Sequence, residues 1–444
     1  MLPRRSFLAS AACLATGCST LNFSVPPYKN EKLPIEKRAE DLLRRLTSEE
    51  KLDLLSGGGW METRANARLG IPAIHMADGP MGIRAWAAPD APDTPEAPKT
   101  VRATAFPAGI AIAATWNPDL AMQQGRVIGQ EAIALGRDQI LGPTVNIQRT
   151  PLWGRNFESY GEDPWLTSRM AVAYISGIQE QGVLATVKHF AANNQEFRRH
   201  TVDVNVPERA LQEIYLPAFQ ASVEEAGVWS VMAAYNKVNG AWCTENPYLL
   251  TEILKKKWGF KGFVVSDWAA THGTETTVNA GLDVEMPAAS AMPGLLRHFN
   301  DAPGGNPGFD GGHLTKDKLR PLLASHAVGQ ASIDDSVRRI LRAMFASGLF
   351  DRKRVTDGPV DTPEQRAVAR AAAVQSIVLL KNERAALPLL KNEIRTIAVI
   401  GPNADVNRLG GGGSSAVTPA YSWKPLDGIR ERAGSDFTVG HARG

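Results

Sequence analysis

The chain has few cysteines, no basic tract and no long apolar segment, and each absence excludes a class of protein. Three cysteines among 444 residues exclude a disulfide-rich scaffold. Lys and Arg total 49 against 46 Asp and Glu, and this near balance with no basic cluster gives no reason to expect nucleic acid as a partner. With 43% apolar and 21% charged residues, the composition is that of a globular protein rather than a membrane-spanning or disordered one.

The first 18 residues have the pattern of an export signal. Arg4 and Arg5 precede an apolar stretch of about ten residues, which is too short to cross a bilayer. The paired arginines before SFL resemble a twin-arginine signal. LATGC resembles a bacterial lipobox, which implies lipidation of Cys18 and a periplasmic or outer-membrane-associated lipoprotein. The alternative is cleavage without lipid, because Ala15 stands where Leu is more usual.

After a polar tether (19–34), residues 35–350 repeat one pattern in which an apolar run ends in polar residues and an amphipathic helix follows. Thr47 and Glu50 have capping-box spacing and predict the start of an early helix. Because the runs are continuously apolar, they predict parallel strands buried on both faces, in an α/β fold. The runs are IPAIHMAD (71–78), LGPTVNIQR (141–149), GVLATVKHF (182–190), VWSVMAAYN (228–236) and GFVVSDW (262–268).

The rest of the chain divides into helices, a linker and the start of a second unit. Helices are expected over 208–227, 246–259 and 332–350, with a Gly- and Pro-rich loop over 288–316. A polar linker (351–363) precedes an incomplete α/β domain (364–444). That domain begins with a helix over 364–380 and continues with a strand over 396–401 and a glycine run.

Polar side chains collect where the apolar runs end, which in a β/α barrel is the face that carries active sites. Taken alone, Asp267 could equally cap the next helix or turn, but five runs ending alike favour one polar pocket. Its carboxylates, amides, cations and one large aromatic suit a neutral polyhydroxylated ligand. The residues at these ends are Asp78, Arg149, Arg155, Lys188, His189, Asn193, Asn194, Tyr235, Asn236, Asp267 and Trp268.

Metal and phosphate binding have weaker support. His189 has no second histidine at ligand spacing, and the only cysteine beyond the export signal, Cys243, is expected to be a small buried hydrophobe. GGGGSS is not followed by the lysine of a phosphate-binding loop, so we interpret it as a mobile loop.

Eight motifs resemble glycoside hydrolase family 3, in its two-domain β-glucosidase branch. They occur in family order between about residues 35 and 430: MADGPMGIR, NIQRTPLWGRNFESYGEDP, TVKHFAANNQEFRRH, VMAAYNKVNG, GFVVSDWAATHG, AGLDVEMP, SIVLLKNERAALPL and GGGGSSAVTP. The resemblance implies a (β/α)8-type TIM-like barrel followed by the start of an α/β/α sandwich domain. It also implies a cofactor-free, retaining β-glucosidase that hydrolyses terminal β-D-glucosyl residues of β-glucosides or oligosaccharides. A β-xylosidase is the alternative within the family.

The same resemblance gives roles to individual residues. Asp267 would attack the anomeric carbon as nucleophile, and Lys188 and Arg155 are expected to hold its pKa down. Glu158 and the pair Glu162-Asp163 would orient Arg155 and its loop. The residues expected to bind the sugar or line its pocket are Asp78, Arg155, Lys188, His189, Met232, Tyr235 and Trp268.

A retaining mechanism also needs an acid/base, and no residue of this chain is assigned to it. In two-domain members this glutamate follows the GGGGSS loop, so we expect it beyond Gly444, in a chain that is truncated within its second domain. His200 is not assigned, because its loop lacks the Asp-Ser-His pattern of the single-domain branch. Two hypotheses therefore stay open beside the glycosidase: a sugar-binding fragment without turnover, and an aldolase with Lys188 as Schiff base.

The lipobox gives the first prediction. Cys18→Ala should move the exported protein from the membrane fraction to the soluble fraction, because it removes the thiol that would carry the lipid. Fractionation of cells making either protein measures this. Equal solubility of both exported proteins would rule out the lipid anchor.

Overall fold

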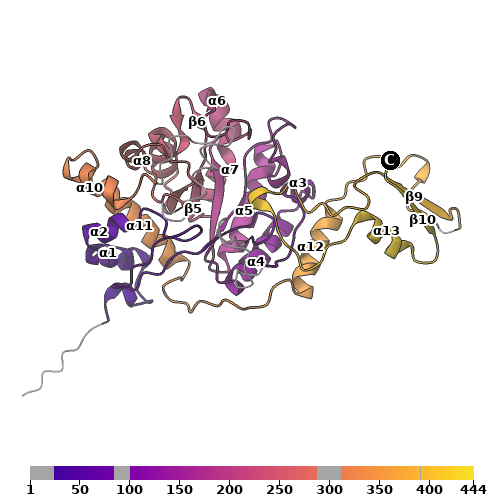
Figure 1. Ribbon diagram of the computed structural model, residues 1–444, viewed down its shortest axis with the longest axis horizontal. Helices are drawn as coiled ribbons and strands as arrows, with labels where there is room; N and C mark the ends of the chain where they lie inside the picture. Colours follow the sequence, from indigo (N-terminus) through magenta and orange to yellow (C-terminus); the bar gives the residue numbers. More distant parts are fainter. Residues whose placement is uncertain (1–24, 85–100, 288–311, 391) are drawn as a thin grey trace, which may run out of the picture.

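The computed structural model describes residues 25–84, 101–287, 312–390 and 392–444, and its centre is a parallel sheet (Figure 1). Five strands hydrogen-bond side by side in the order β1-β2-β3-β5-β8, and every neighbouring pair is parallel. All five are buried along their whole length, as the apolar runs predict. Their bounds are β1 (Met76–Asp78), β2 (Gln139–Leu141), β3 (Leu184–Phe190), β5 (Ser230–Ala233) and β8 (Phe263–Ser266).

The sheet curls beyond β8 through single bridges rather than full strands. Val265 bridges Val284, and Glu285 bridges Ser56, both in parallel sense. Antiparallel bridges at 57–63 and 62–75 then lead back to the residue before β1. The architecture is therefore TIM-like, but the described residues contain five barrel strands where eight were expected. The turn at 57–63 is tight, since a Cβ on Gly58 would lie 2.7 Å from the carbonyl oxygen of Thr63.

Helices cover the outside of the sheet, and two of them begin at residues whose side chains cap them. Asn117 and Asp163 cap α4 and α5, and a proline follows each cap at the first helical position. These two helices approach so closely that a Cβ on Gly125 would lie 2.3 Å from the Tyr174 carbonyl oxygen. The helices of the first unit are α1 (Ile35–Arg45), α2 (Ser48–Asp53), α3 (Gly109–Ala114), α4 (Pro118–Ala134), η2 (Asn156–Glu158), α5 (Pro164–Gln179), α6 (Glu208–Ala210), η3 (Leu211–Tyr215), α7 (Pro217–Glu224), η4 (Cys243–Glu245), η5 (Tyr248–Lys257), α8 (Thr274–Ala280), α10 (Lys316–Ala324) and α11 (Gln330–Ala346). None of the helices in the described ranges is long and apolar enough to cross a membrane.

Most expected elements are present, and several differ in their bounds. The capping box of Thr47 and Glu50 at α2 is confirmed. The helix expected over 208–227 is interrupted before Pro217, which cannot donate a backbone hydrogen bond. The strand expected over 141–149 ends at Leu141, because Gly142-Pro143 interrupts the ladder. Most of the loop expected over 288–316 lies outside the described residues.

The second unit is small and has few buried apolar residues. Strands β9 (Thr396–Ile400) and β10 (Thr438–Ala442) pair in parallel, with α13 (Pro425–Ala433) between them in the chain. Helix α12 (Pro363–Gln375) lies against α4 of the first unit (Figure 1), and the residues expected to continue it to 380 are not helical. Ile377 and Leu380 are 80% and 91% exposed. The buried core therefore lies mainly in the first unit.

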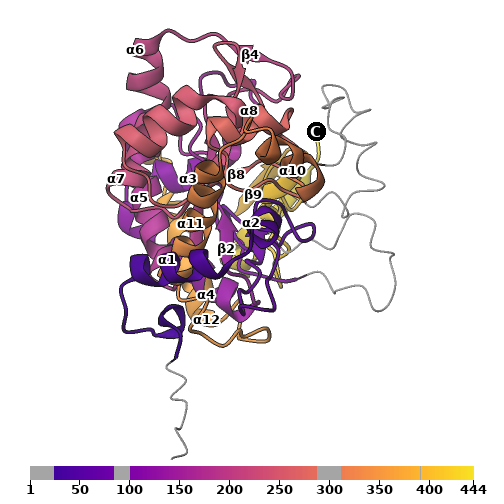
Figure 2. The ribbon, with the colours of Figure 1, turned by 90° about the vertical axis from the view of Figure 1, so that its left-hand side faces the viewer.

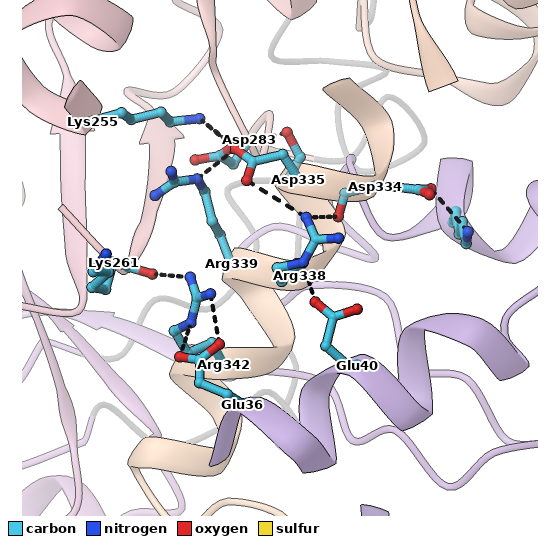
Figure 3. A network of polar contacts seen from close by, with 12 residues as sticks. Glu36, Glu40, Lys255, Lys261, Asp283, Asp334, Asp335, Arg338, Arg339 and Arg342 are labelled. Carbon is cyan, nitrogen blue, oxygen red and sulfur yellow. Dashed lines mark hydrogen bonds and ion pairs between the residues drawn. The ribbon is translucent and has the colours of Figure 1, made fainter. Parts of the chain in front are cut away.

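A seam of charged residues joins the two ends of the first unit. Helix α1 packs alongside α11 (Figure 2), and Glu36 on α1 accepts two hydrogen bonds from Arg342 on α11 at 2.6 and 2.8 Å. Deeper in the seam, the buried carboxylate of Asp283 accepts from Lys255, Ser336 and the backbone of Val264, each at 2.8 Å. Figure 3 shows how Asp283 connects Lys255 to this side of α11.

The Lys255–Asp283 pair is buried more deeply than the Arg342–Glu36 pair, so we predict that breaking each changes the stability by a different amount. Asp283→Asn should lower the free energy of unfolding by about 3–5 kcal/mol, because it leaves the buried Lys255 ammonium without its closest anion. Glu36→Gln, at a more exposed pair, should lower it by less than about 1 kcal/mol. Urea unfolding of the two variants measures the difference. Equal effects would show that burial does not decide the strength of these pairs.

Candidate active site

Seven of the eight predicted pocket residues lie at the carboxyl ends of four of the five strands, and the eighth, Arg155, lies in the loop after β2. Asp78 is the last residue of β1, and Asp267 follows β8 directly. Lys188 and His189 are the two residues before the last residue of β3. Met232 lies in β5, while Tyr235 and Trp268 follow β5 and β8. All seven are at most 8% exposed, although five of them are polar or charged or carry a hydroxyl group. Buried polar groups need partners, and their partners show how the site is built.

Asp267 is the centre of these contacts. Its Oδ1 accepts from the Trp268 backbone N–H at 2.8 Å, and the Tyr235 hydroxyl donates to the same carboxylate. The Nε2 atom of His189 lies 3.7 Å from Oδ2. The two donors follow β8 and β5, so these neighbouring strands hold the nucleophile candidate in place, while His189 lies close to it from β3.

The pKa of Asp267 differs from the expectation. Burial raises it, while the cations of Arg199, Arg155 and Lys188 and the Trp268 N–H act in the opposite direction. The two cations expected from the sequence do act on Asp267, but the net shift is upward rather than downward. Desolvation of the charged form therefore outweighs three nearby positive charges.

Lys188 and Asp78 form a buried ion pair, with Nζ 3.3 Å from Oδ1. Their side chains are only 2% and 9% exposed, so neither charge is left alone in the interior. The pair joins the end of β3 to the end of β1. It presents a cation and a carboxylate side by side, which suits two adjacent hydroxyl groups of one ligand.

His189 is held in its neutral form. Burial and then the cations of Arg155, Lys188 and Arg199 bring its pKa well below 6.5. Asn146 donates through its amide nitrogen to the His189 carbonyl and accepts the His189 backbone N–H at 2.8 Å, which fixes the amide orientation. The Asn146 oxygen is 3.0 Å from Nδ1, so Nδ1 carries the proton. Nε2 is then an acceptor that faces the pocket near Asp267.

Arg155 is supported as expected by Glu158, but not by the next acidic pair. Its guanidinium forms a short ion pair with Glu158, whose pKa is lowered in spite of its burial because Arg155 and Lys188 are close. Asp163 instead caps α5 by accepting from the Leu166 N–H at 2.8 Å, and Glu162 is exposed. The expectation that this pair orients Arg155 is therefore wrong.

The glycine run of the second unit lies against the site. Arg84 donates to the Gly413 carbonyl, Arg155 lies 3.4 Å from the Ser414 hydroxyl, and Ser415 hydrogen-bonds to Glu158. The Ala103 N–H also donates to the Thr418 carbonyl at 3.1 Å. The sequence interpretation as a mobile loop did not anticipate these contacts, because a polyglycine segment gives no sign of what it packs against.

Several other residues have roles that the sequence did not indicate. Arg199 and Asn146 act on Asp267 and His189 and were not selected. Arg199 lies outside the apolar runs, and Asn146 lies inside the run 141–149 but before its last residue. Conversely, three residues selected from the sequence have other surroundings. Arg149 is exposed, and the amide nitrogens of Asn194 and Asn236 donate to backbone carbonyls. Cys243 is buried, and burial raises its pKa to about 12. Cys18 lies outside the described residues.

The carboxylates near Asp267 have features of charge-bearing groups rather than proton donors. Asp78, Glu158 and Glu196 each contact a cation, from Lys188, Arg155 and Arg199 respectively. A general acid needs a raised pKa, whereas a neighbouring cation favours the ionised form. Within the described ranges no group of three metal-binding side chains occurs.

The raised pKa of Asp267 predicts a change in stability. The folded state binds the Asp267 proton more tightly than the unfolded state, whose reference pKa is 3.8. Stability is therefore lost as the pH rises from 3.8 through the higher pKa of the folded state. Asp267→Asn removes the buried charge and should unfold at a higher urea concentration than wild type at pH 7. The gain should shrink as the pH is lowered toward 4. Lower stability of the variant at pH 7 would show that the three cations outweigh burial.

Known proteins share this fold and these motifs over most of the chain. Residues 71–343 match the glycosyl hydrolase family 3 N terminal domain, and residues 377–442 match the family's C-terminal domain. A beta-glucosidase of Rhizobium radiobacter is 42% identical over 91% of this chain and 46% of its own length. A beta-glucosidase of Bacteroides ovatus is 42% identical over 92% of this chain and 54% of its own.

A solved structure agrees with these matches. Beta-glucosidase 3B of Thermotoga neapolitana, in complex with glucose, superposes with a TM-score of 0.79 at 36% identity, over 91% of this chain and 55% of its own. The chain spans about half the length of the curated relatives that it matches. With both family domains matched in order, the chain belongs to glycosyl hydrolase family 3.

Proposed function

We propose that this chain carries the sugar-binding and nucleophile half of a retaining β-glucosidase. The observation that carries the proposal is Asp267, a buried carboxylate at the end of β8 with an aligned Trp268 N–H donor and a Tyr235 hydroxyl. A nucleophile aimed by a rigid strand needs little reorganisation when the sugar binds. The beta-glucosidase relatives, and their structures in complex with glucose, support the choice of substrate.

In the proposed reaction, Asp267 attacks the anomeric carbon as the bond to the leaving oxygen breaks. The product of this step is a glycosyl ester on Asp267, and the leaving oxygen takes a proton. Water then attacks the anomeric carbon, loses a proton, and releases the sugar and the Asp267 carboxylate. Because the pKa of Asp267 is raised, the attack by its carboxylate needs a pH above the usual aspartate range.

The remaining side chains suit the hydroxyls and the apolar face of one glucosyl unit. The Lys188–Asp78 pair offers one donor and one acceptor side, Arg155 donates, and neutral His189 accepts through Nε2. Trp268 and Met232 supply apolar surface, as a sugar ring face requires. The substrate of a β-xylosidase lacks the hydroxymethyl group of a glucoside, and this activity is the second candidate within the family.

Two alternatives have less support. An aldolase would use Lys188 as a neutral amine, but this residue forms a buried ion pair with Asp78. A sugar-binding fragment without turnover is favoured by the absence of an assigned proton donor among the described carboxylates. It is opposed by the intact set of contacts around Asp267.

We further propose, from Arg4, Arg5 and Cys18, that the protein is exported and anchored through lipid.

The test uses a leaving group that needs no proton. 2,4-Dinitrophenyl β-glucoside should glycosylate Asp267, giving an adduct that intact-mass spectrometry detects and peptide mapping places. Asp267→Asn should lower the rate by about 10⁴-fold or more, because the nucleophile is lost. Azide should speed release of the adduct as glucosyl azide, since azide needs no general base, while cellobiose should be nearly inert.

Two results would contradict the proposal. A loss of only a few-fold in Asp267→Asn would remove Asp267 as nucleophile. Brisk cellobiose hydrolysis without an azide effect would mean that a residue of this chain already supplies the acid/base.

A further inference from the structure

A carboxylate at the rim of the site joins two of its loops. Glu196 accepts the indole N–H of Trp153 at 3.0 Å and a guanidinium N–H of Arg199 at 2.8 Å. Trp153 lies in the loop that carries Arg155, and Arg199 lies in the loop after β3. Trp153 is only 3% exposed and provides a fixed anchor, whereas the side chains of Glu196 and Arg199 are 28% and 31% exposed.

Arg199 connects this carboxylate to the nucleophile. Its guanidinium carbon is 4.5 Å from the ring centroid of Tyr235, whose hydroxyl donates to Asp267. Among the cations that lower the pKa of Asp267, Arg199 has the largest effect. The contacts thus run from Trp153 through Glu196, Arg199 and Tyr235 to the reacting carboxylate.

We propose that Glu196 is a positioning residue that holds Arg199 against Tyr235 and Asp267. The inference rests on the proposed function of Asp267 and adds a residue to which no role has been given. A long side chain with one-third of its surface exposed has many rotamers, and its charged end prefers water. Without the anchored carboxylate, the guanidinium turns toward solvent, where its charge is screened from Asp267.

The direction in which the pKa of Asp267 shifts when Glu196 is replaced distinguishes a positioning role from a purely electrostatic one. Glu196 is an anion near both Arg155 and Arg199. If it acted only through its negative charge, removing that charge would lower the pKa of Asp267. If it holds Arg199 in place, removing it raises that pKa, because the largest opposing cation moves away.

The substitution leaves the other charged groups around this pocket in place. Lys188 and Arg155 still face Asp267, and each keeps its own carboxylate. His189 and His200, which also face these cations, have pKa values lowered by burial, well below 6.5 and to about 3 respectively. They therefore stay neutral across the pH range of the test.

The experiment measures the ionisation of Asp267 in the full chain in two ways. Protein with ¹³C-labelled aspartate carboxyls is titrated by NMR, and the signal absent from Asp267→Asn identifies this residue. The rate of labelling by 2,4-dinitrophenyl 2-deoxy-2-fluoro-β-glucoside is followed against pH by intact mass. In Glu196→Gln, the acid limb should move up by about one unit, and labelling below it should slow about tenfold.

Three comparisons make the result decisive. Glu225→Gln removes the same kind of partner from Arg169, which likewise lies 4.7 Å over an aromatic ring, that of Trp165, and should leave the titration unchanged. Arg199→Gln should shift the acid limb upward as far as Glu196→Gln does. The double variant should shift it no further, because both changes remove one interaction. Glu196→Asp should restore part of the wild-type profile.

Other outcomes overturn the inference. A downward shift, no shift, or additive shifts in the double variant would each show that Glu196 does not position Arg199. Absence of labelling in wild type would defeat the proposed function alone, since the NMR titration still reports the effect of Arg199 on the ionisation of Asp267. If Glu196→Gln fails to fold, Trp153→Phe removes only the indole donor and should give a smaller upward shift. No upward shift in that variant would also overturn the inference.

Discussion

The structure of the site depends on keeping one buried carboxylate usable as an anion. Asp267 is 8% exposed, and burial alone favours its neutral form. Three cations oppose this effect, and each of them has a carboxylate partner of its own: Asp78 for Lys188, Glu158 for Arg155 and Glu196 for Arg199. The pocket therefore gathers positive charge around Asp267 without leaving any of these cations unpaired in a low-dielectric interior.

This charge balance explains why the site needs so many loops. A single strand end presents only two or three side chains to the pocket, so the three ion pairs come from β1, β3 and the loops after β2 and β3. The parallel sheet brings these ends together at one edge, which is how barrel folds assemble active sites. The second unit adds Gly413, Ser414 and Ser415 to the same region, so its glycine run is part of the wall around Arg155.

The sequence predicted the strands and the residues at their ends because both follow from local patterns. A continuously apolar run indicates a doubly buried strand, and Asp78, Lys188, His189 and Asp267 could be found by counting to its end. Arg199 is in a loop, where direction is set by tertiary contacts, and no local pattern marks it. Asn146 lies within the run 141–149, but the pattern does not single it out from its neighbours. The number of barrel strands was also not predictable, because segments such as 56–63 pair through single bridges that apolar periodicity does not reveal. The pKa of Asp267 was predicted in the wrong direction because charges can be counted in a sequence, whereas the depth of burial cannot.

The balance of charges also limits how the site can be changed. Lys188 and Asp78 are nearly fully buried, so neutralising either one strands its partner in the interior and disturbs the fold as well as the chemistry. The pair of Arg199 and Glu196 is partly exposed, and solvent can compensate either charge when the other is lost. Of the three ion pairs, the rim pair is therefore the one at which the field at Asp267 can vary without a large penalty in stability. Differences in acid tolerance between proteins built on this site should accordingly arise at positions 196 and 199 rather than at the buried pairs.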